Sequence, residues 1–225
     1  KKEEDVVVLV YYDYECYMDC NQHKVAYIVS MVYPGRMHVF DSTSEFIDYL
    51  DRLYMTCFNG VKEKNRKMIC YAHNAGRYDM HFIKKEYLRR KVKTKDTVNG
   101  CNMFCIKVRN GPIFLDSYKI IPIPLRMFPK TFGLNDTSKK GYFPYRYLTK
   151  ERYESRENEP TLPDIEWFDF KLLKSKERKE AEEWYWEEKK KYEDPHIEYD
   201  IHTECVEYCK QDVRLLGEGL QKFDQ

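Results

Sequence analysis

Two carboxylates, Asp13 and Glu15, follow an apolar run at residues 6–12 that is typical of a strand buried on both faces. Because alternate residues of a strand point to the same face, both carboxylates would share one face at the end of this strand. Carboxylates held this close repel each other unless a cation neutralises them, and Mg2+ and Mn2+ prefer oxygen ligands of this kind. Taken alone, the pair would also fit two solvated side chains in a loop.

Two further acids stand beside tyrosines. Asp79 follows Tyr78 at the start of a predicted helix, where the helix dipole by itself would also favour an acid. Asp212 comes four residues after Tyr208 on a predicted C-terminal helix, so the two side chains share one helix face. A surface acid beside a half-buried tyrosine would also fit that pair. The order of the three acidic segments along the chain carries more weight than any one of them.

The elements that must position these acids alternate between strands and helices, which predicts an α/β fold with a mixed sheet flanked by helices. One hairpin is predicted at 24–33 and 36–40, with a type II turn at Tyr33-Pro34-Gly35-Arg36. A second is predicted at 101–109 and 112–116 around Asn110-Gly111. The remaining early elements are a strand at 67–72, a helix at 78–90, and a helix capped by Ser42 or Ser44 with Phe46, Ile47, Leu50 and Leu53 facing inward.

Charge becomes dense after residue 147, and all three tryptophans occur there. A helix is predicted at about 171–193, since helix-forming residues are abundant and Pro195 lies beyond its end. The last helix begins near Asp200 and carries Val206, Cys209, Val213 and Leu216 at helical spacing. We therefore expect 1–147 and 199–225 to form one domain, with 148–198 as an insertion or helical subdomain.

Composition limits the classes of protein that the chain could be. Hydrophobic residues make up 42% of 225 residues, enough for a full core, and no apolar run is long enough for a membrane helix. The chain shows no signal peptide and does not begin with Met, so we expect an intracellular, reducing compartment, no membrane partner, and a piece of a longer protein. The eight cysteines include three C-x3-C pairs, which zinc sites seldom use, so buried thiols are expected.

The net charge of +1 gives no sign of a polyanionic partner, but cations are concentrated between residues 84 and 95. This stretch could contact a phosphate backbone, or it could be an ordinary solvated surface. Its members are Lys84, Lys85, Arg89, Arg90, Lys91, Lys93 and Lys95, opposed within the stretch by Glu86 alone.

D-x-E at 13–15, N-x3-YD at 74–79 and Y-x3-D at 208–212 together resemble the three exonuclease motifs of DEDD exonucleases, in particular the proofreading domains of B-family DNA polymerases. Tyr208 matches the DEDDy branch, because the DEDDh branch has a His where Glu207 stands. Lys140-Gly141-Tyr142-Phe143 resembles the K-x2-hydrophobic motif of the protein-primed members found in viruses, polinton-like elements and linear plasmids. Ser117-Tyr118 with Ile121 is similar to their (S/T)-L-x2-hydrophobic motif, with Tyr118 in place of Leu.

This resemblance implies an RNase H-like, DnaQ-like exonuclease fold and metal-dependent 3′–5′ hydrolysis of single-stranded DNA ends. It implies two Mg2+ or Mn2+ ions held by Asp13, Glu15, Asp79 and Asp212. Tyr208 would orient the attacking water, and Lys140 would contact the scissile phosphate. The positions implied to bind the strand are Cys16 (where Thr is common), Tyr71, His73, Asn74, Tyr78, Phe82, Ser117 and Tyr118.

The partners implied are a single-stranded DNA 3′ end, the polymerase domain of the same longer chain, and a terminal priming protein. Two other interpretations remain open. One is a stand-alone or RNA-directed exonuclease with the same site. The other is a non-catalytic module with an exonuclease-like fold that binds nucleic acid or protein.

Overall fold

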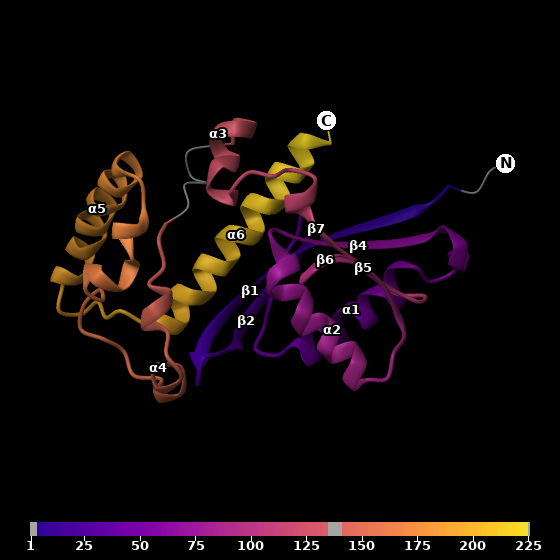
Figure 1. Ribbon diagram of the computed structural model, residues 1–225, viewed down its shortest axis with the longest axis horizontal. Helices are drawn as coiled ribbons and strands as arrows, with labels where there is room; N and C mark the ends of the chain where they lie inside the picture. The colour runs from indigo at the N-terminus through magenta and orange to yellow at the C-terminus, as the bar shows by residue number, and fades with distance from the viewer. Residues whose placement is uncertain (1–3, 135–140, 225) are drawn as a thin grey trace. The chain divides into compact units, whose positions relative to one another are not determined.

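The computed structural model of the protein describes residues 4–134 and 141–224 (Figure 1). Its centre is a seven-stranded sheet in the order β3-β2-β1-β4-β7-β6-β5. The strands are β1 (Val6–Asp19), β2 (Gln22–Val32), β3 (Met37–Phe40), β4 (Arg66–Ala72), β5 (Thr94–Asn99), β6 (Asn102–Val108) and β7 (Ile113–Asp116). β4 runs parallel to both β1 and β7, whereas β2–β3, β5–β6 and β6–β7 are antiparallel. The predicted mixed α/β sheet is therefore confirmed.

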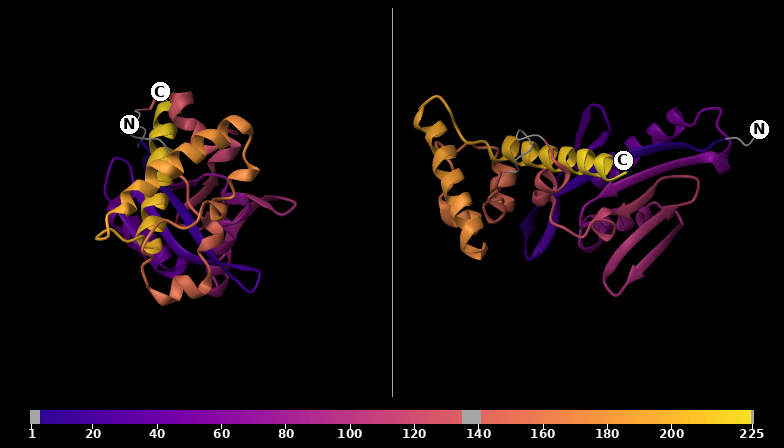
Figure 2. Two further views of the ribbon diagram at one scale, coloured as in Figure 1. Left: turned by 90° about the vertical axis from the view of Figure 1, so that its left-hand side faces the viewer. Right: turned by 90° about the horizontal axis from the view of Figure 1, so that it is seen from above.

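The longer helices flank this sheet or follow it in the chain. They are α1 (Thr43–Cys57), α2 (Asp79–Arg89), α3 (Phe128–Phe132), α4 (Lys150–Ser155), α5 (Ser175–Lys190) and α6 (Ile201–Phe223). α6 is one uninterrupted helix, as the right-hand view of Figure 2 shows. No helix among the described residues is long and apolar enough to cross a membrane.

The chain divides into two compact units. Unit 1 comprises Lys1–Tyr14, Tyr27–Lys139 and Cys209–Gln225, and unit 2 comprises Glu15–Ala26 and Lys140–Tyr208. The division falls inside β1, β2 and α6, so these elements contribute residues to both units.

Alternation along β1 sorts the core of unit 1 into two faces. Tyr11 packs in a cluster with Cys209, Val213 and Leu216 of α6. Its neighbour Tyr12 points the other way, and its ring lies 5.4 Å from Phe46 of α1 and 6.0 Å from Phe114 of β7. Asp13 continues the face of Tyr11, the side of the sheet that α6 covers.

Two predictions about β1 and the first hairpin are wrong. β1 continues to Asp19, so Asp13 and Glu15 lie inside the strand and not at its end. The strand closes at Cys20 and Asn21, which both have positive φ, as the two central residues of a type I′ hairpin turn require. The full length of β1 could not be predicted, because Asp and Glu are uncommon inside strands and Cys-Asn is an unusual turn sequence.

The predicted type II turn at 33–36 is also wrong, because that turn needs positive φ at Gly35, which has none. The Tyr33–Pro34 peptide bond is cis. Glycine is required at 35 for space, since an added Cβ would lie 2.5 Å from the carbonyl oxygen of Val32.

Most other elements agree with the predictions. Ser42 caps α1, accepting a hydrogen bond from the backbone N–H of Glu45 at 3.2 Å. The second hairpin, β4, α2 and α6 are confirmed within a few residues, and α5 is shorter than the predicted 171–193. β5 was not predicted, because its sequence is mostly polar and exposed and shows no apolar alternation.

Unit 2 contains an aromatic cluster of its own, in which α5 packs against two single-turn helices, η7 (Ile165–Phe168) and η8 (Phe170–Leu172). Trp184 lies 5.8 Å from Phe168 between ring centroids, whereas Trp186 is 55% exposed. The segment 160–198 starts and ends at a backbone bridge in which the N–H groups of Glu159 and Tyr199 each donate to the other's carbonyl. The two ends of this segment therefore lie side by side, and the segment forms a closed loop in the chain.

Candidate carboxylate site

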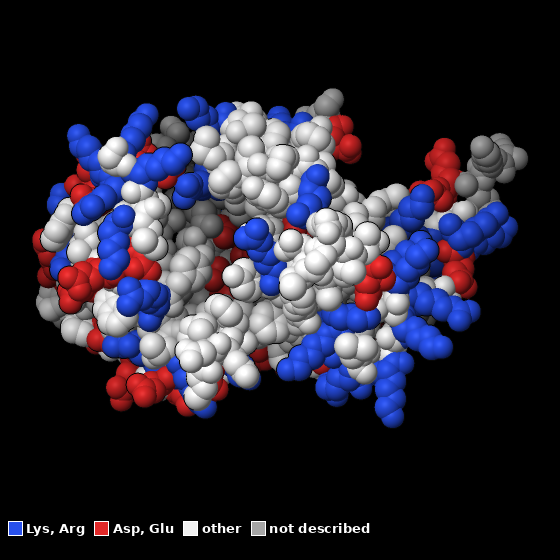
Figure 3. Space-filling model, viewed as in Figure 1, with Lys and Arg blue, Asp and Glu red and all other residues white. Residues whose placement is uncertain are grey.

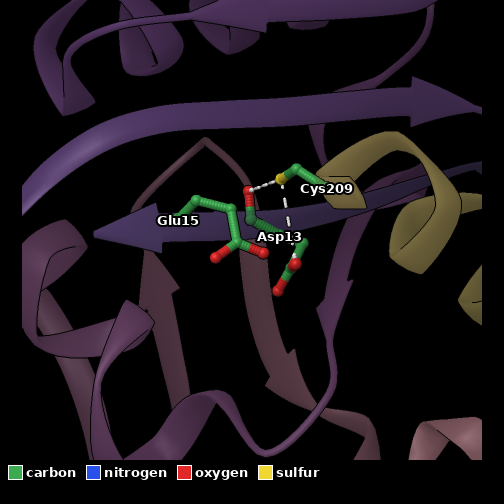
Figure 4. Close-up of side chains that lie close together, drawn as sticks. All are labelled: Asp13, Glu15 and Cys209. Atoms are coloured by element: carbon green, nitrogen blue, oxygen red, sulfur yellow. Dashed lines mark hydrogen bonds between the residues drawn. The ribbon is translucent and has the colours of Figure 1, made fainter. Parts of the chain in front are cut away.

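The face of β1 that α6 covers carries the first acid of the site. The Cys209 thiol of α6 donates to the backbone carbonyl of Asp13 at 3.4 Å and lies 3.8 Å from its Oδ2 (Figure 4). Asp212, one turn further along α6, shares the helix face of Cys209 and is buried. Long-range packing of α6 on β1 thus brings the first and last predicted motifs together.

Glu15 lies two residues beyond Asp13 on the same strand face and is 3% exposed. One ligand atom each from Asp13, Glu15 and Cys209 lie within 4.8 Å of one another. Carboxylate oxygens suit Mg2+ and Mn2+, whereas a thiol is a ligand for softer ions. The shared strand face predicted for the D-x-E pair is present, and the adjacent thiol was not anticipated.

Asp79 joins this group from the first turn of α2. Burial raises the pKa of Asp79 well above its ordinary value, and the charges of Asp13 and Asp116 raise it further. Asp79 is therefore close enough to Asp13 and Asp116 to be affected by their negative charges. Carboxylate oxygens gathered in this way suit a divalent cation.

Asp116 is a member of this group that the sequence analysis missed. It ends β7, beside Ala72 of β4, and is buried. Its carboxylate accepts hydrogen bonds from the backbone N–H groups of Gly76 at 3.1 Å and Tyr118 at 3.0 Å. Asp116 thereby links the loop before Asp79 to the segment after β7. An Asp at the end of a predicted strand, directly before the Ser117 motif, was the available signal.

The loop between β4 and α2 has a demanding backbone. Asn74 adopts the left-handed conformation, with φ of 57°. Gly76 packs so closely that an added Cβ would lie 2.2 Å from the carbonyl oxygen of Met103. Asn and Gly are the residues best suited to these two positions, which explains part of the motif in structural terms.

His73, Ser117 and Tyr118, all predicted to bind the strand, lie together. The His73 ring contacts the Ser117 hydroxyl through Nδ1 at 2.9 Å and the carbonyl oxygen of Ile123 through Nε2 at 2.8 Å. Its ring centroid lies 5.4 Å from that of Tyr118, edge to face. Both ring nitrogens of His73 therefore have partners within the protein.

The other predicted strand-binding aromatics differ in exposure. Tyr71 stacks on Tyr11 with centroids 6.3 Å apart, and Phe82 stacks on Tyr14 at 5.6 Å with an interplanar angle of 8°. Both are half-buried, whereas Tyr78 is 53% exposed. Of these three rings, that of Tyr78 is the most exposed.

In unit 2, Tyr208 packs between two aromatic side chains. Its ring centroid lies 5.5 Å from that of Phe143 and 5.7 Å from that of Tyr145. Tyr145 is 49% exposed and was not among the predicted site residues, although it follows the K-x2-hydrophobic motif by two positions. Cys16 is half-buried on β1. Lys140 lies outside the described residues.

Comparisons with known proteins place this geometry in a family. The family described as "DNA polymerase type B, organellar and viral" matches residues 61–225. No curated protein matches the chain.

Among solved structures, the fold is similar to phi29 DNA polymerase complexed with primer-template DNA, with a TM-score of 0.58, 16% identity and coverage of 96% of this chain and 31% of that one. It is also similar to phi29 DNA polymerase complexed with single-stranded DNA, with a TM-score of 0.57, 16% identity and coverage of 95% and 30%. The chain thus spans about a third of the length of these polymerases. At this identity the likeness concerns the fold, and the family match covers most of the chain. The chain belongs to the organellar and viral type-B DNA polymerase family.

Proposed function

We propose that this chain is the 3′–5′ exonuclease part of a protein-primed type-B DNA polymerase and hydrolyses the 3′ end of single-stranded DNA to nucleoside monophosphates. The observation that carries the proposal is the convergence of buried carboxylates from β1 and α2 around Asp13, with α6 packed beside it. Oxygen ligands gathered in this way are those that Mg2+ and Mn2+ prefer. The polymerase body of a longer chain and a terminal priming protein are proposed as its partners.

Asp13, Glu15, Asp79 and Asp212 would hold two Mg2+ or Mn2+ ions. When bound, such ions activate a water and stabilise charge on the attacking and leaving oxygens of a phosphodiester. The residues of the chain do the rest. Tyr208, held between Phe143 and Tyr145, orients the attacking water through its hydroxyl and is a poor base at neutral pH. Lys140 is proposed to contact the scissile phosphate.

The exposed ring of Tyr78 is proposed to stack on the terminal bases, which contributes about 1–3 kcal/mol per base and is indifferent to sequence. Such indifference suits an enzyme that must remove any mismatched nucleotide. The half-buried rings of Tyr71 and Phe82 are held by Tyr11 and Tyr14, and would line the path of the strand.

The test is degradation of a 5′-labelled single-stranded DNA oligonucleotide with Mg2+ or Mn2+, with EDTA and an Asp13→Ala variant as controls. A ladder that shortens from the 3′ end, needs metal and vanishes in the variant would support the proposal. A matched RNA strand in the same assay distinguishes an RNA-directed enzyme. Binding of the strand without any cleavage would favour a non-catalytic module.

Asp13→Ala or Asp212→Ala should reduce cleavage by at least about a hundredfold, because each removes a ligand needed to stabilise the transition state. Binding of single-stranded DNA in Ca2+ should survive in both variants. Near-normal cleavage in either variant would contradict the assignment of the site.

Tyr208→Phe should cause only a partial loss of cleavage, since the ring still packs against Phe143 and Tyr145 while the hydroxyl is removed. Single-turnover rates of the wild type and the variant would measure this. A loss as deep as that of Asp13→Ala would show that the proposed role of Tyr208 is wrong.

A further inference from the structure

Two lysines of the edge hairpin stand directly opposite each other. In the β5–β6 register Lys95 pairs with Lys107, and both side chains are exposed. Directly opposed side chains in an antiparallel pair have Cβ atoms about 5 Å apart, and like charges there are destabilising. The Lys95–Lys107 pair therefore destabilises the hairpin, and the packing of the fold does not explain why both positions carry lysine.

The acids near this pair are engaged elsewhere. Asp96, the neighbour of Lys95, points to the opposite face and forms an ion pair with Lys84 of α2 at 2.6 Å. Glu86 of α2 is held by Arg89 and Arg90. Within residues 4–134 and 141–224, no carboxylate lies within ion-pair distance of Lys95 or Lys107.

The hairpin has one buried face and one charged face. Ile106 and Val108 of β6 are buried, and this strand contacts α2. Lys95 and Lys107 point away from that side by strand alternation. Lys93, two residues before Lys95, and Arg109, two residues after Lys107, are also exposed and make no ion pair within the described part of the chain. We name Lys93, Lys95, Lys107 and Arg109 the basic ladder.

Figure 3 shows Lys and Arg gathered over the region of α2 and the strands beside it, with few acids among them. Of the basic stretch at 84–95, Lys84, Arg89 and Arg90 are used in ion pairs inside the fold. Of the other cations in this stretch, Lys93 and Lys95 belong to the ladder. Lys95 lies on β5 and Lys107 on β6, whereas Lys93 comes just before β5 and Arg109 just after β6.

Lys95 and Lys107, as opposed residues of the strand pair, have Cβ atoms about 5 Å apart. Closely spaced cations that form no ion pair among the described residues suit a polyanion, whose phosphates can meet them without base contacts. We propose that the basic ladder binds the phosphate backbone of DNA, as a contact separate from the carboxylate site. The choice of DNA over other polyanions rests on the proposed function.

The test is binding of fluorescently labelled single-stranded and duplex DNA by this chain in EDTA, where no metal-dependent cleavage occurs, across a range of salt concentrations. The ladder variant is Lys95→Ala with Lys107→Ala. The matched control is Arg52→Ala with Lys64→Ala, which removes the same charge from exposed cations of α1 and of the turn before β4. Thermal unfolding of all three proteins is measured alongside.

We expect the ladder variant to bind about tenfold more weakly, and the slope of log affinity against log salt to fall by about 1.4 for a single strand or 1.8 for a duplex. If the slope falls for only one of single-stranded and duplex DNA, that form is the one that the basic ladder binds. The melting temperature should stay the same or rise, because a repulsive pair is removed, so that weaker binding cannot be attributed to unfolding.

Equal slopes in the ladder variant and the wild type, or equal losses in the ladder and control variants, would overturn the inference. Equal slopes are the result expected if the ladder binds an acidic protein surface and not DNA. Because binding is measured without metal, the outcome does not depend on whether the chain cleaves DNA. Cleavage that fails while the slope changes would contradict the proposed function alone.

Discussion

At the scale of single residues, the dominant feature is a buried carboxyl group, that of Asp79, which lies near two other acids. Asp79 is surrounded by Asp13 and Asp116, and all three come from different elements. Selection for stability alone would not favour an acid at position 79, since burial and the charges of Asp13 and Asp116 raise its pKa. Reduced local stability of this kind is typical of a functional site, and it agrees with the cation site proposed above.

Asp79→Asn should raise the melting temperature in EDTA by a few degrees, because it removes one of the repelling charges while keeping nearly the same side-chain volume. The same variant should lose at least about a hundredfold in cleavage, since an amide is a weaker metal ligand. Asp41→Asn, at an exposed position, is the control and should change neither quantity. A lower melting temperature for Asp79→Asn in EDTA would contradict this account.

Addition of Mg2+ or Mn2+ should stabilise the wild type and leave Asp79→Asn less affected, because a ligand that binds the folded state stabilises it more when its affinity is higher. Thermal unfolding with and without metal measures this difference. Equal stabilisation of both proteins would mean that Asp79 is not a ligand.

At the scale of elements, α1 and α2 are joined by a charged network. The nearby Arg89 and Arg90 lower the pKa of Glu86 to about 2 against the opposing effect of its burial. Arg90 extends the network to α1, donating to Asp48 at 2.7 Å and to the carbonyl oxygen of Ser44 at 2.8 Å. Because α2 begins at Asp79, this network also supports one end of the carboxylate site.

Glu86→Gln should lower the free energy of unfolding at pH 7 by about 1–2 kcal/mol. The folded pKa lies below the unfolded one, so this stabilisation is fully present above about pH 4.5 and is lost as pH falls toward 2. Urea unfolding from pH 7 to pH 3 should therefore show the difference between wild type and variant shrinking with acid. Glu63→Gln, exposed on the turn before β4, is the control. A difference that grows on acidification would contradict the assignment.

At the scale of the whole molecule, the charged segment 148–198 makes aromatic contacts that lead to Tyr208, the proposed water-orienting residue. Trp184 of α5 lies 5.2 Å from Tyr142, and the next residue, Phe143, packs on Tyr208. Tyr142 also contacts Phe170 at 5.1 Å. The cluster therefore supports the segment that holds the Tyr208 ring, within unit 2.

Trp184→Ala should lower the cleavage rate by about tenfold with little change in DNA affinity, because Tyr208 would be held less firmly. Trp186→Ala is the matched control, since its side chain is largely exposed, and should change the rate by less than about twofold. Single-turnover cleavage and binding in Ca2+ separate the two effects. Equal rates for both variants would show that the insertion does not position Tyr208.

The residue spacings by themselves determined which acids share a strand or helix face. D-x-E and Y-x3-D depend only on the periods of 2 and 3.6 residues, which any strand or helix obeys. The same local rules located Ser42 as a cap and the hairpin at Asn110-Gly111. These features could be predicted because neighbours in sequence decide them.

Only the tertiary structure decided which elements meet. That Cys209 lies against Asp13, that Asp116 completes the acidic group, and that Lys95 faces Lys107 all depend on the packing and register of elements distant in sequence. Strand order and register are set by the burial of apolar faces summed over the whole sheet. No local pattern contains that sum, so the convergence of the carboxylates and the basic ladder became visible only in the folded chain.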